Sequence, residues 1–181
     1  MVNIKNISTK TGDQGKTSLA NGQRLAKDEL VFEVIGTLDE LNSWLGLVLS
    51  QLDQQFDAEK QFLIFLQQQL FVMGAELAGA KKVQLASQVL NKIEQHSSSL
   101  QKQMADDWHN KFVLPGGSQS AAQLDIARTV CRRAERRLVS YHLQYQARPL
   151  LLKTLNRLSD YLYVLRCWVN FKQGVKEILF D

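Results

Sequence analysis

Three arginines of the chain recur at every fourth residue, which is the spacing of one helix face. On a helix, Arg128, Arg132 and Arg136 span an arc of about 80°, away from the apolar residues of the same segment. Such a stripe of guanidinium groups can bind phosphate oxygens through paired hydrogen bonds. Because Asp125 and Glu135 fall inside or beside the arc, the spacing leaves a second interpretation open: a solvated basic face with acidic partners on its own helix.

A second polar feature runs along the last apolar segment, residues 149–173. Asn156, Asp160, Tyr163 and Asn170 fall within about 80° of one another if this segment is helical. Polar groups on an otherwise apolar helix need partners. The strip therefore predicts either a contact with a ligand or a hydrogen-bond network between helices, and the sequence leaves both open.

The first 27 residues contain glycines, hydroxyl groups and lysines but no apolar periodicity. Gly15-Lys16-Thr17 matches the end of the phosphate loop GxxxxGK[ST], yet Lys10 stands where the first glycine would be, and no buried strand precedes it. This mismatch disfavours a P-loop ATPase. Glycines that let the backbone approach a ligand, with lysines nearby, suit a triphosphate, and a flexible surface loop is the alternative.

The histidines and cysteines give little support to a metal site. His96, His109 and His142 lack a partner one helical turn away, so we expect no metal site built from histidine. Cys131 and Cys167 are too few for a disulfide framework or a cysteine-based zinc site. Both fall in helical patterns, which favours buried free thiols.

Long helices must position these groups, because apolar residues recur with helical spacing over most of the chain. We expect one domain, residues 1–181, in which an arm at 1–27 precedes an all-α, five-helix up-and-down bundle at 28–181. Thr37 and Glu40 resemble a capping box, so the first helix could also begin near residue 37. Residues 105–118, with Pro115, are expected to form a connection. The expected helices cover residues 28–52, 58–79, 84–103, 118–148 and 149–173.

Composition sets broad limits on the protein. A chain of 181 residues with 45% hydrophobic residues is long enough to bury a core of its own. No run approaches eighteen apolar residues, and the N-terminus lacks the features of a signal peptide, so we expect no membrane association and a cytoplasmic location. A net charge of +4 permits binding of polyanions without requiring it.

Taken together, five segments resemble the PduO-type ATP:cob(I)alamin adenosyltransferases, also called corrinoid adenosyltransferases. They occur in the order found in that family and cover nearly the whole chain, which is far more specific than any single motif. The segments are Thr9–Gly15, Gly36–Asn42, Phe112–Gly117, Ala127–Arg136 and Leu155–Tyr161.

The resemblance implies a homotrimer with ATP and the corrinoid at each subunit interface. In the implied reaction the cobalt of cob(I)alamin attacks C5′ of ATP, which forms adenosylcobalamin and expels triphosphate. The protein's tasks are then positioning and electrostatic stabilisation. The implied stabilisers of the triphosphate are Lys10, Lys27, Arg132 and Arg136, together with a Mg²⁺ ion. The ATP phosphates are expected to hold this ion, and no metal-binding side chains are implied. A reductase that supplies the electron and a B12-dependent enzyme that receives the product are candidate partners.

The family pattern also implies roles for individual residues. Asp39 and Arg128 resemble an ion pair that crosses the subunit interface and orders the site, and they join Arg132 and Phe112 as the implied catalytic residues. The residues implied to bind ATP are Thr9, Lys10, Thr11, Gly12, Thr17, Ser18, Lys27, Arg132, Glu135, Arg136 and Asn156.

Two aromatic residues are implied to bind the corrinoid. Phe112 resembles the residue that occupies the lower face of the corrin and displaces its dimethylbenzimidazole ligand, which makes cob(II)alamin easier to reduce. Tyr163 is implied to line the corrin, although some relatives are expected to carry phenylalanine there. Phe180, near the C-terminus, is a further candidate cover for the corrin.

Two other classes of function fit parts of the sequence. A carrier that retains adenosylcobalamin and delivers it to a dependent enzyme would need the same fold and the same site. A helical nucleic-acid binder could use the arginine stripe, but no aromatic stacking surface accompanies it, and Asp125 and Glu135 interrupt the charge, so no nucleic-acid partner is expected.

Overall fold

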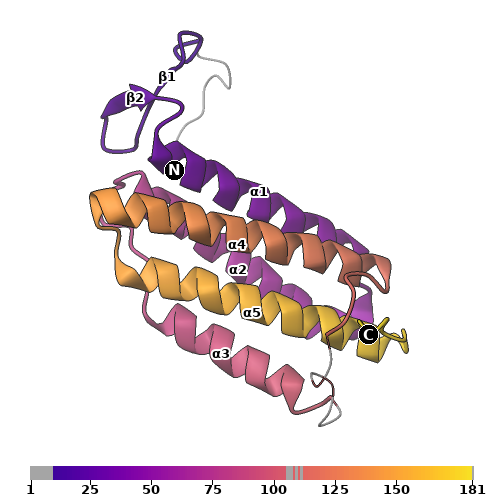
Figure 1. Ribbon diagram of the computed structural model, residues 1–181. Coiled ribbons are helices and arrows are strands. Elements are labelled where there is room, and N and C mark those ends of the chain that lie inside the picture. The colour runs from indigo at the N-terminus through magenta and orange to yellow at the C-terminus, as the bar shows by residue number, and fades with distance from the viewer. Residues whose placement is uncertain (1–9, 105–107, 109, 111, 181) are drawn as a thin grey trace.

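The computed structural model describes residues 10–104, 108, 110 and 112–180, and it contains the five expected helices. They form the predicted helical bundle (Figure 1). Two short strands and one turn of 3-10 helix, at Gln54–Phe56, are the other regular elements of the described residues. The helices are α1 Leu30–Gln51, α2 Asp57–Leu77, α3 Gln88–Gln101, α4 Gln119–Tyr145 and α5 Pro149–Lys172.

The helix boundaries follow local chemistry. The alternative start near residue 37 is wrong, because α1 already begins at Leu30, and the Thr37 hydroxyl donates to the Glu33 carbonyl at 2.6 Å inside the helix. The third helix is shorter than predicted at both ends. Ser118 caps α4 by accepting from Ala121 N–H at 3.3 Å. Pro149 is the first residue of α5, as predicted.

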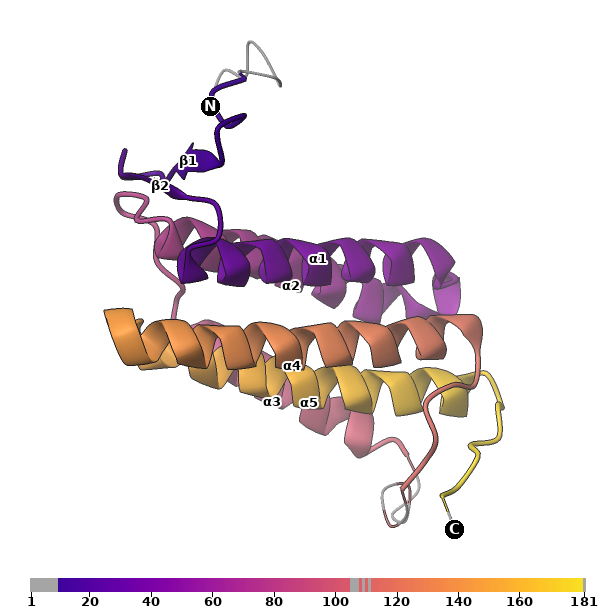
Figure 2. The same cartoon turned by 45° about the horizontal axis from the view of Figure 1, so that its top comes forward.

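Successive helices alternate in direction (Figures 1 and 2). α1 packs against α2 and α4, α5 packs against α4 and α3, and the ring of Phe62 in α2 contacts His96 of α3 and Tyr161 of α5. α4 packs against α1 on one side and α5 on the other. The core is continuous along the bundle, and both cysteines are buried free thiols, as predicted. Leu41, Leu45, Leu124, Leu138 and Leu165 are completely buried.

The arm carries a small hairpin that the sequence analysis did not predict. Strand β1, Lys16–Ser18, pairs antiparallel with β2, Arg24–Ala26, and Thr17 lies opposite Leu25. Three-residue strands are too short for apolar alternation to reveal them. In Figures 1 and 2 the hairpin projects from the end of the bundle where α1 begins.

The opposite end of the bundle holds the loop before α4 and the C-terminal segment. Val113 and Leu179 form an antiparallel bridge, Leu114 N–H donates to the Ile178 carbonyl at 2.8 Å, and Phe180 N–H donates to the Phe112 carbonyl at 2.9 Å. This loop and the hairpin are therefore separated by the length of α4, about 40 Å for 27 residues. Among the described residues, no helix is both long and apolar enough to cross a membrane.

Candidate functional site

A cavity of about 440 Å³ opens between α3, α4 and α5 and is the centre of the candidate site. This volume lies in the usual range for small-molecule sites. The arginine stripe predicted from spacing contributes Arg128 and Arg132, and the polar strip contributes Asp160 and Tyr163. The other lining residues are Ile93, Glu94, Ser97, Gln101, Arg157, Ser159 and Val164.

Arg128 lies in this cavity with few partners of its own. Its Nε is 3.8 Å from the Asp125 carboxylate one turn earlier, and that buried nitrogen makes no hydrogen bond to any described residue. Its guanidinium carbon is 6.0 Å from the centre of the Tyr163 ring. The intrahelical partner considered from the sequence is thus present for Arg128, but it leaves donors of the guanidinium unused.

Arg132 and Arg136 are exposed, and neither makes an ion pair with a described residue. Glu135, the other acidic partner considered from the sequence, turns instead to α5, where its Oε1 accepts from Asn156 Nδ2 at 3.0 Å. The side-chain oxygen of Asn156, Oδ1, accepts from the Arg157 guanidinium at 3.0 Å. The structure therefore links Glu135 with Asn156 and leaves two guanidinium groups available beside them.

The arm brings several predicted ATP ligands close to one another. A Cβ atom at Gly12 would lie 3.0 Å from Lys27 Nζ, so the missing side chain at this glycine makes room for the ammonium group. Lys27 N–H donates to the Gly15 carbonyl at 2.8 Å, and the Arg24 guanidinium donates to the Thr11 carbonyl. Lys10, Thr17 and Ser18 belong to the same arm, whereas Thr9 lies outside the described residues.

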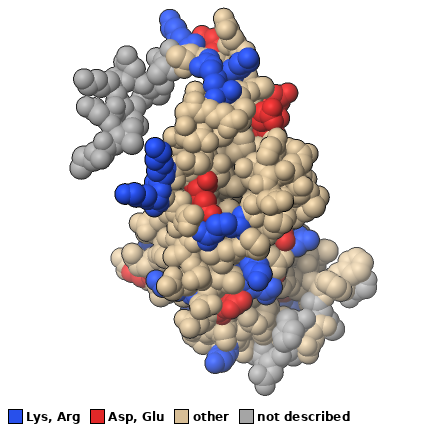
Figure 3. Space-filling view, turned by 90° about the vertical axis from the view of Figure 1, so that its left-hand side faces the viewer, with Lys and Arg blue, Asp and Glu red and all other residues tan. Residues whose placement is uncertain are grey.

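Within one chain, the arm and the cavity lie apart. Leu19 and Leu25 of the arm face Tyr141 and Tyr145 at the end of α4, around a separate cavity of about 210 Å³. None of the described residues of the arm lines the cavity between α3, α4 and α5. On the face shown in Figure 3, lysines and arginines are interspersed with acidic side chains and form no continuous basic surface.

Asp39 and Arg128 are also apart within the chain. Asp39 is exposed on the side of α1 that faces α2, where it lines a mostly apolar cavity of about 440 Å³ with Leu70, Phe71 and Gly74. Arg128 lines the cavity on the other side of the bundle. An ion pair between these two residues can therefore form only between two copies of the chain.

The predicted corrinoid residues lie toward the other end of the bundle. The Phe112 side chain is 83% exposed, far above the usual exposure of a phenylalanine. Tyr163 is half-buried and faces Trp108, with ring centres 6.2 Å apart. Burial, followed by the nearby Cys167, raises the pKa of the Tyr163 hydroxyl, so this hydroxyl is neutral at physiological pH.

Sequence reasoning missed several residues of the cavity. Arg157 bonds Asp160 Oδ2 at 3.0 Å and lies 3.8 Å from Glu94 of α3, so it joins two walls of the cavity. Ser97 and Gln101 of α3 complete that wall. No pattern marked α3, because its polar residues resemble an ordinary solvated face until the helix is placed beside α5.

Metal-binding side chains do not gather in the part of the chain that the structure describes. No group of three or more His, Cys, Asp or Glu residues there is placed to hold a metal ion. Burial lowers the pKa of His96, and this effect outweighs the opposite effect of the Glu59 carboxylate. The His96 ring stacks on the Phe62 ring, with ring centres 4.0 Å apart.

Comparison with known proteins relates this geometry to one family. The family model described as cobalamin adenosyltransferase matches residues 7–169. The corrinoid adenosyltransferase of Bacillus subtilis is 38% identical over 180 residues, covering 97% of this chain and 92% of that protein. The corrinoid adenosyltransferase PduO of Salmonella typhimurium is 40% identical over 168 residues, covering 88% of this chain but only 48% of that longer protein.

Solved structures agree with the sequence matches. A PduO-type ATP:corrinoid adenosyltransferase from Lactobacillus reuteri, a variant with alanine in place of a phenylalanine, superposes with a TM-score of 0.91 at 31% identity. The match covers 97% of this chain and 99% of that one, and that structure is a complex with cobalamin and ATP.

Proposed function

Because the chain belongs to the cobalamin adenosyltransferase family, we propose that it transfers the 5′-deoxyadenosyl group of ATP to cob(I)alamin. The electron pair of Co(I) forms the cobalt–carbon bond at C5′. The bond between C5′ and the triphosphate oxygen breaks, and triphosphate leaves with the electron pair of this broken bond. The products are adenosylcobalamin and triphosphate.

One observation carries this proposal: Arg132, which lines the cavity, and Arg136, one turn further along α4, make no ion pair with a described residue. Neighbouring positive charges repel one another, and an anion between them removes that repulsion. A leaving triphosphate gathers negative charge during the reaction, so guanidinium groups placed before the reaction stabilise its transition state. Asn156 and Glu135 are then positioned to orient the nucleotide.

The proposed active site includes more than one subunit. The arm, with Lys10, Thr11, Gly12 and Lys27, projects from the bundle and does not line the cavity of its own chain. In a homotrimer, the arm of one subunit supplies the remaining nucleotide ligands, among them Thr9, Thr17 and Ser18, to the cavity of the next. The same assembly pairs Asp39 of one subunit with Arg128 of another, and the separation of these two residues within a chain supports this pairing.

Phe112 and Tyr163 are proposed to contact the corrinoid. A phenylalanine that is 83% exposed is well placed to cover an apolar ring system, and burying it there is worth about 2 kcal/mol. With Phe112 on the lower face of the corrin, cob(II)alamin loses its axial nitrogen ligand and becomes easier to reduce.

Other components of the reaction belong to this proposal. Mg²⁺ enters with the ATP phosphates, because a hard cation prefers their oxygens and the chain offers no clustered ligands in its described part. A reductase supplies the electron that converts Co(II) to Co(I), and a B12-dependent enzyme receives the product. The cytoplasm, which contains ATP, is the proposed location.

A spectroscopic assay tests the proposed function directly. Purified protein is mixed with chemically reduced cobalamin and Mg-ATP without oxygen, and the corrinoid absorbance spectrum is followed together with release of triphosphate. We expect stoichiometric formation of adenosylcobalamin and triphosphate. Conversion no faster than in the protein-free control rejects the enzyme, and tight binding of added adenosylcobalamin without conversion would favour the carrier instead.

A further inference from the structure

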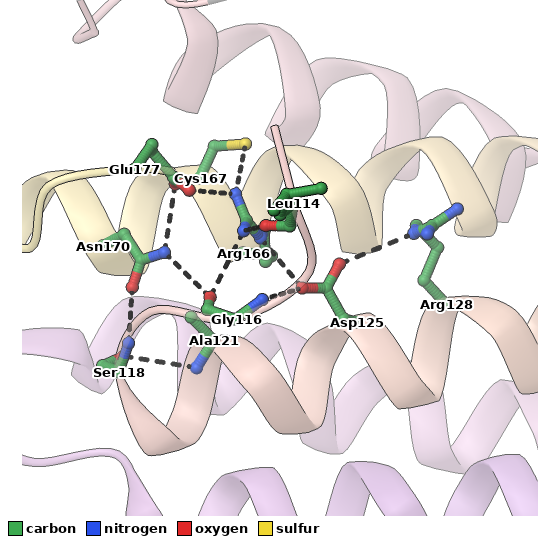
Figure 4. Close-up of polar contacts among 10 residues, drawn as sticks. All are labelled: Leu114, Gly116, Ser118, Ala121, Asp125, Arg128, Arg166, Cys167, Asn170 and Glu177. Atoms are coloured by element: carbon green, nitrogen blue, oxygen red, sulfur yellow. Dashed lines mark hydrogen bonds and ion pairs between the residues drawn. The ribbon is translucent and has the colours of Figure 1, made fainter. Parts of the chain in front are cut away.

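A buried arginine that the ATP and corrinoid assignments do not use connects two segments at the Phe112 end of the bundle. Arg166 of α5 is 1% exposed and lies on the buried side of this helix. Its guanidinium donates to Asp125 Oδ2 at 3.1 Å and to Glu177 Oε2 at 2.6 Å (Figure 4). It also donates to the carbonyl oxygens of Leu114 at 2.8 Å and Gly116 at 3.2 Å.

These contacts keep Arg166 charged. Burial alone would lower the pKa of a guanidinium, but the contacts with Cys167, Asp125 and Glu177 outweigh it and leave the pKa raised. A buried charge is tolerated only where it is paired and hydrogen-bonded, and Arg166 meets both conditions. Two of its partners are backbone carbonyls of the loop before α4, so the charge fixes the path of that loop.

Asn170, one turn further along α5, fixes the same loop. Its Oδ1 accepts from Ser118 N–H at 2.9 Å, and its Nδ2 donates to the Gly116 carbonyl at 3.2 Å and to Glu177 Oε1 at 3.0 Å. A Cβ atom at Gly117 would overlap the Asn170 side chain, which explains why this position is glycine.

Glu177 is the point at which the C-terminal segment joins this network. One carboxylate oxygen bonds Arg166 and the other bonds Asn170, so the segment is held at two points of α5. The neighbouring residues 178–180 pair with Phe112–Leu114 through two backbone hydrogen bonds. The backbone of Phe112 is therefore held by the C-terminal segment, while its side chain remains exposed.

We propose that Arg166 and Glu177 are positioning residues that hold Phe112 in place to displace the lower ligand of the corrinoid. The inference deepens the proposed function and depends on it. Neither residue contacts the reacting atoms; both act through the backbone of the loop. A misplacement of about 1 Å in a supporting residue can cost up to about 100-fold in rate, so the paired segments matter although they lie away from the chemistry.

Glu177→Gln is the sharpest test, because Glu177 lies at the accessible end of the network. Its side chain is 25% exposed, whereas Arg166→Ala would leave Asp125 buried with less compensation and risks unfolding the protein. The glutamine keeps the size of the side chain and removes its charge. Lys176→Gln is the matched control, since Lys176 is exposed on the same segment and also loses one charge.

Each variant is assayed with two Co(II) corrinoids and a reductant: cobalamin, and cobinamide, which lacks the dimethylbenzimidazole ligand. With cobalamin, we expect Glu177→Gln to lower kcat by about tenfold and to lower the fraction of bound four-coordinate Co(II), measured by electron paramagnetic resonance. With cobinamide, where no ligand has to be displaced, we expect a loss of less than about twofold. Lys176→Gln should match the wild type with both corrinoids.

The outcomes separate this inference from the proposed function. An inactive wild-type protein rejects the proposed function itself. If the wild type is active, equal losses with cobalamin and cobinamide in Glu177→Gln overturn the positioning role and leave a general structural one. Wild-type behaviour of Glu177→Gln with cobalamin overturns it as well. Thermal melts by circular dichroism verify that each variant is folded at the assay temperature.

Discussion

Helix α4 carries two sets of arginines, and they differ in their partners. Arg133 and Arg137 face α1: Arg133 pairs with Glu40, and Arg137 bonds Glu33 Oε2 at 2.7 Å and Thr37 Oγ1 at 2.6 Å. On the side toward the cavity, Arg132 and Arg136 make no ion pair with a described residue, and Arg128 has only Asp125, at 3.8 Å. The second set is the arginine stripe identified from spacing.

The difference separates arginines that join two helices from arginines with few or no partners among the described residues. The two sets lie about 120° apart on the helix, so both are compatible with the same helical pattern. Only the placement of α1 and its glutamates determines which set is paired. Like charges that remain clustered without counter-charges repel one another, and we expect such an arrangement where an anionic substrate completes it.

The largest expected effect is that of Arg132→Ala. Loss of one group that stabilises the leaving triphosphate should lower kcat/KM by about 100- to 1000-fold. Thermal stability should stay near that of the wild type, because Arg132 is exposed and makes no ion pair with described residues. Steady-state kinetics with varied ATP and a circular-dichroism melt measure both quantities.

Arg137→Ala is the control for that experiment, because its guanidinium is held by α1. We expect a loss of about 1 kcal/mol in stability and little change in activity. A comparable fall in activity in both variants, or a collapsed melt for Arg132→Ala alone, would contradict the distinction between the two sets.

The second expected effect concerns Arg128 and its proposed partner on another subunit. Asp39→Asn should remove the proposed intersubunit counter-charge of Arg128, which weakens the oligomer and lowers activity by at least about tenfold. Analytical ultracentrifugation beside the activity assay measures both effects. Glu40→Gln is the matched control on the next residue, since Glu40 pairs within the chain with Arg133. Full activity and unchanged mass for Asp39→Asn would argue against the intersubunit ion pair.

A smaller effect is expected at Asn156 of α5, which bonds Glu135 of α4. Asn156→Asp replaces a donor to Glu135 by a second carboxylate, so a hydrogen bond of 3.0 Å is lost and like charges face each other. We expect KM for ATP to rise by about tenfold, equivalent to 1.4 kcal/mol, with kcat less affected. Lys153→Gln, exposed on the same helix, should change neither constant. An unchanged KM for Asn156→Asp would place Asn156 outside the nucleotide site.

The smallest effect is expected at Tyr163, which lies beside Arg128. Burial raises the pKa of its hydroxyl above the ordinary value of about 10, so the group stays neutral below that pH and contributes no charge to the site. Tyr163→Phe should therefore change kcat/KM by less than about twofold and leave the pH–rate profile unchanged up to pH 10. If wild-type activity fell with rising pH below 10 and Tyr163→Phe abolished that fall, ionisation of Tyr163 would have a role.

Much of the bundle could be predicted from local patterns. The apolar periodicity located all five helices, and Ser118 and Pro149 gave the starts of α4 and α5, because capping and proline act within a few residues. The capping-box interpretation at Thr37 failed because the hydroxyl bonds the preceding turn and the Arg137 guanidinium, a contact with a residue 100 positions away.

The candidate site was predictable only in part. The stripe and the strip do meet at one cavity, through Arg128, Arg132, Asp160 and Tyr163. Arg166 was missed, although it lies only about 40° from Asn170 on the helix, because an arginine among apolar residues does not by itself reveal its partners. One partner, Asp125, lies 41 positions earlier in the chain, and the other, Glu177, lies in the segment after α5. Only folding brings them to Arg166.

The amino-acid sequence by itself determined the helices, the arginine stripe, the glycine-bearing arm and the resemblance to one family, since periodicity, turn chemistry and motif order are local properties of the chain. The tertiary structure decided which arginines are paired and that Arg166 joins the Phe112 loop to the C-terminal segment. It also decided that Asp39 and the arm lie away from the cavity of their own chain. These results depend on which side chains face one another across helices. Electrostatic and hydrogen-bond energies depend on the distance between two groups in space and not on their separation along the chain.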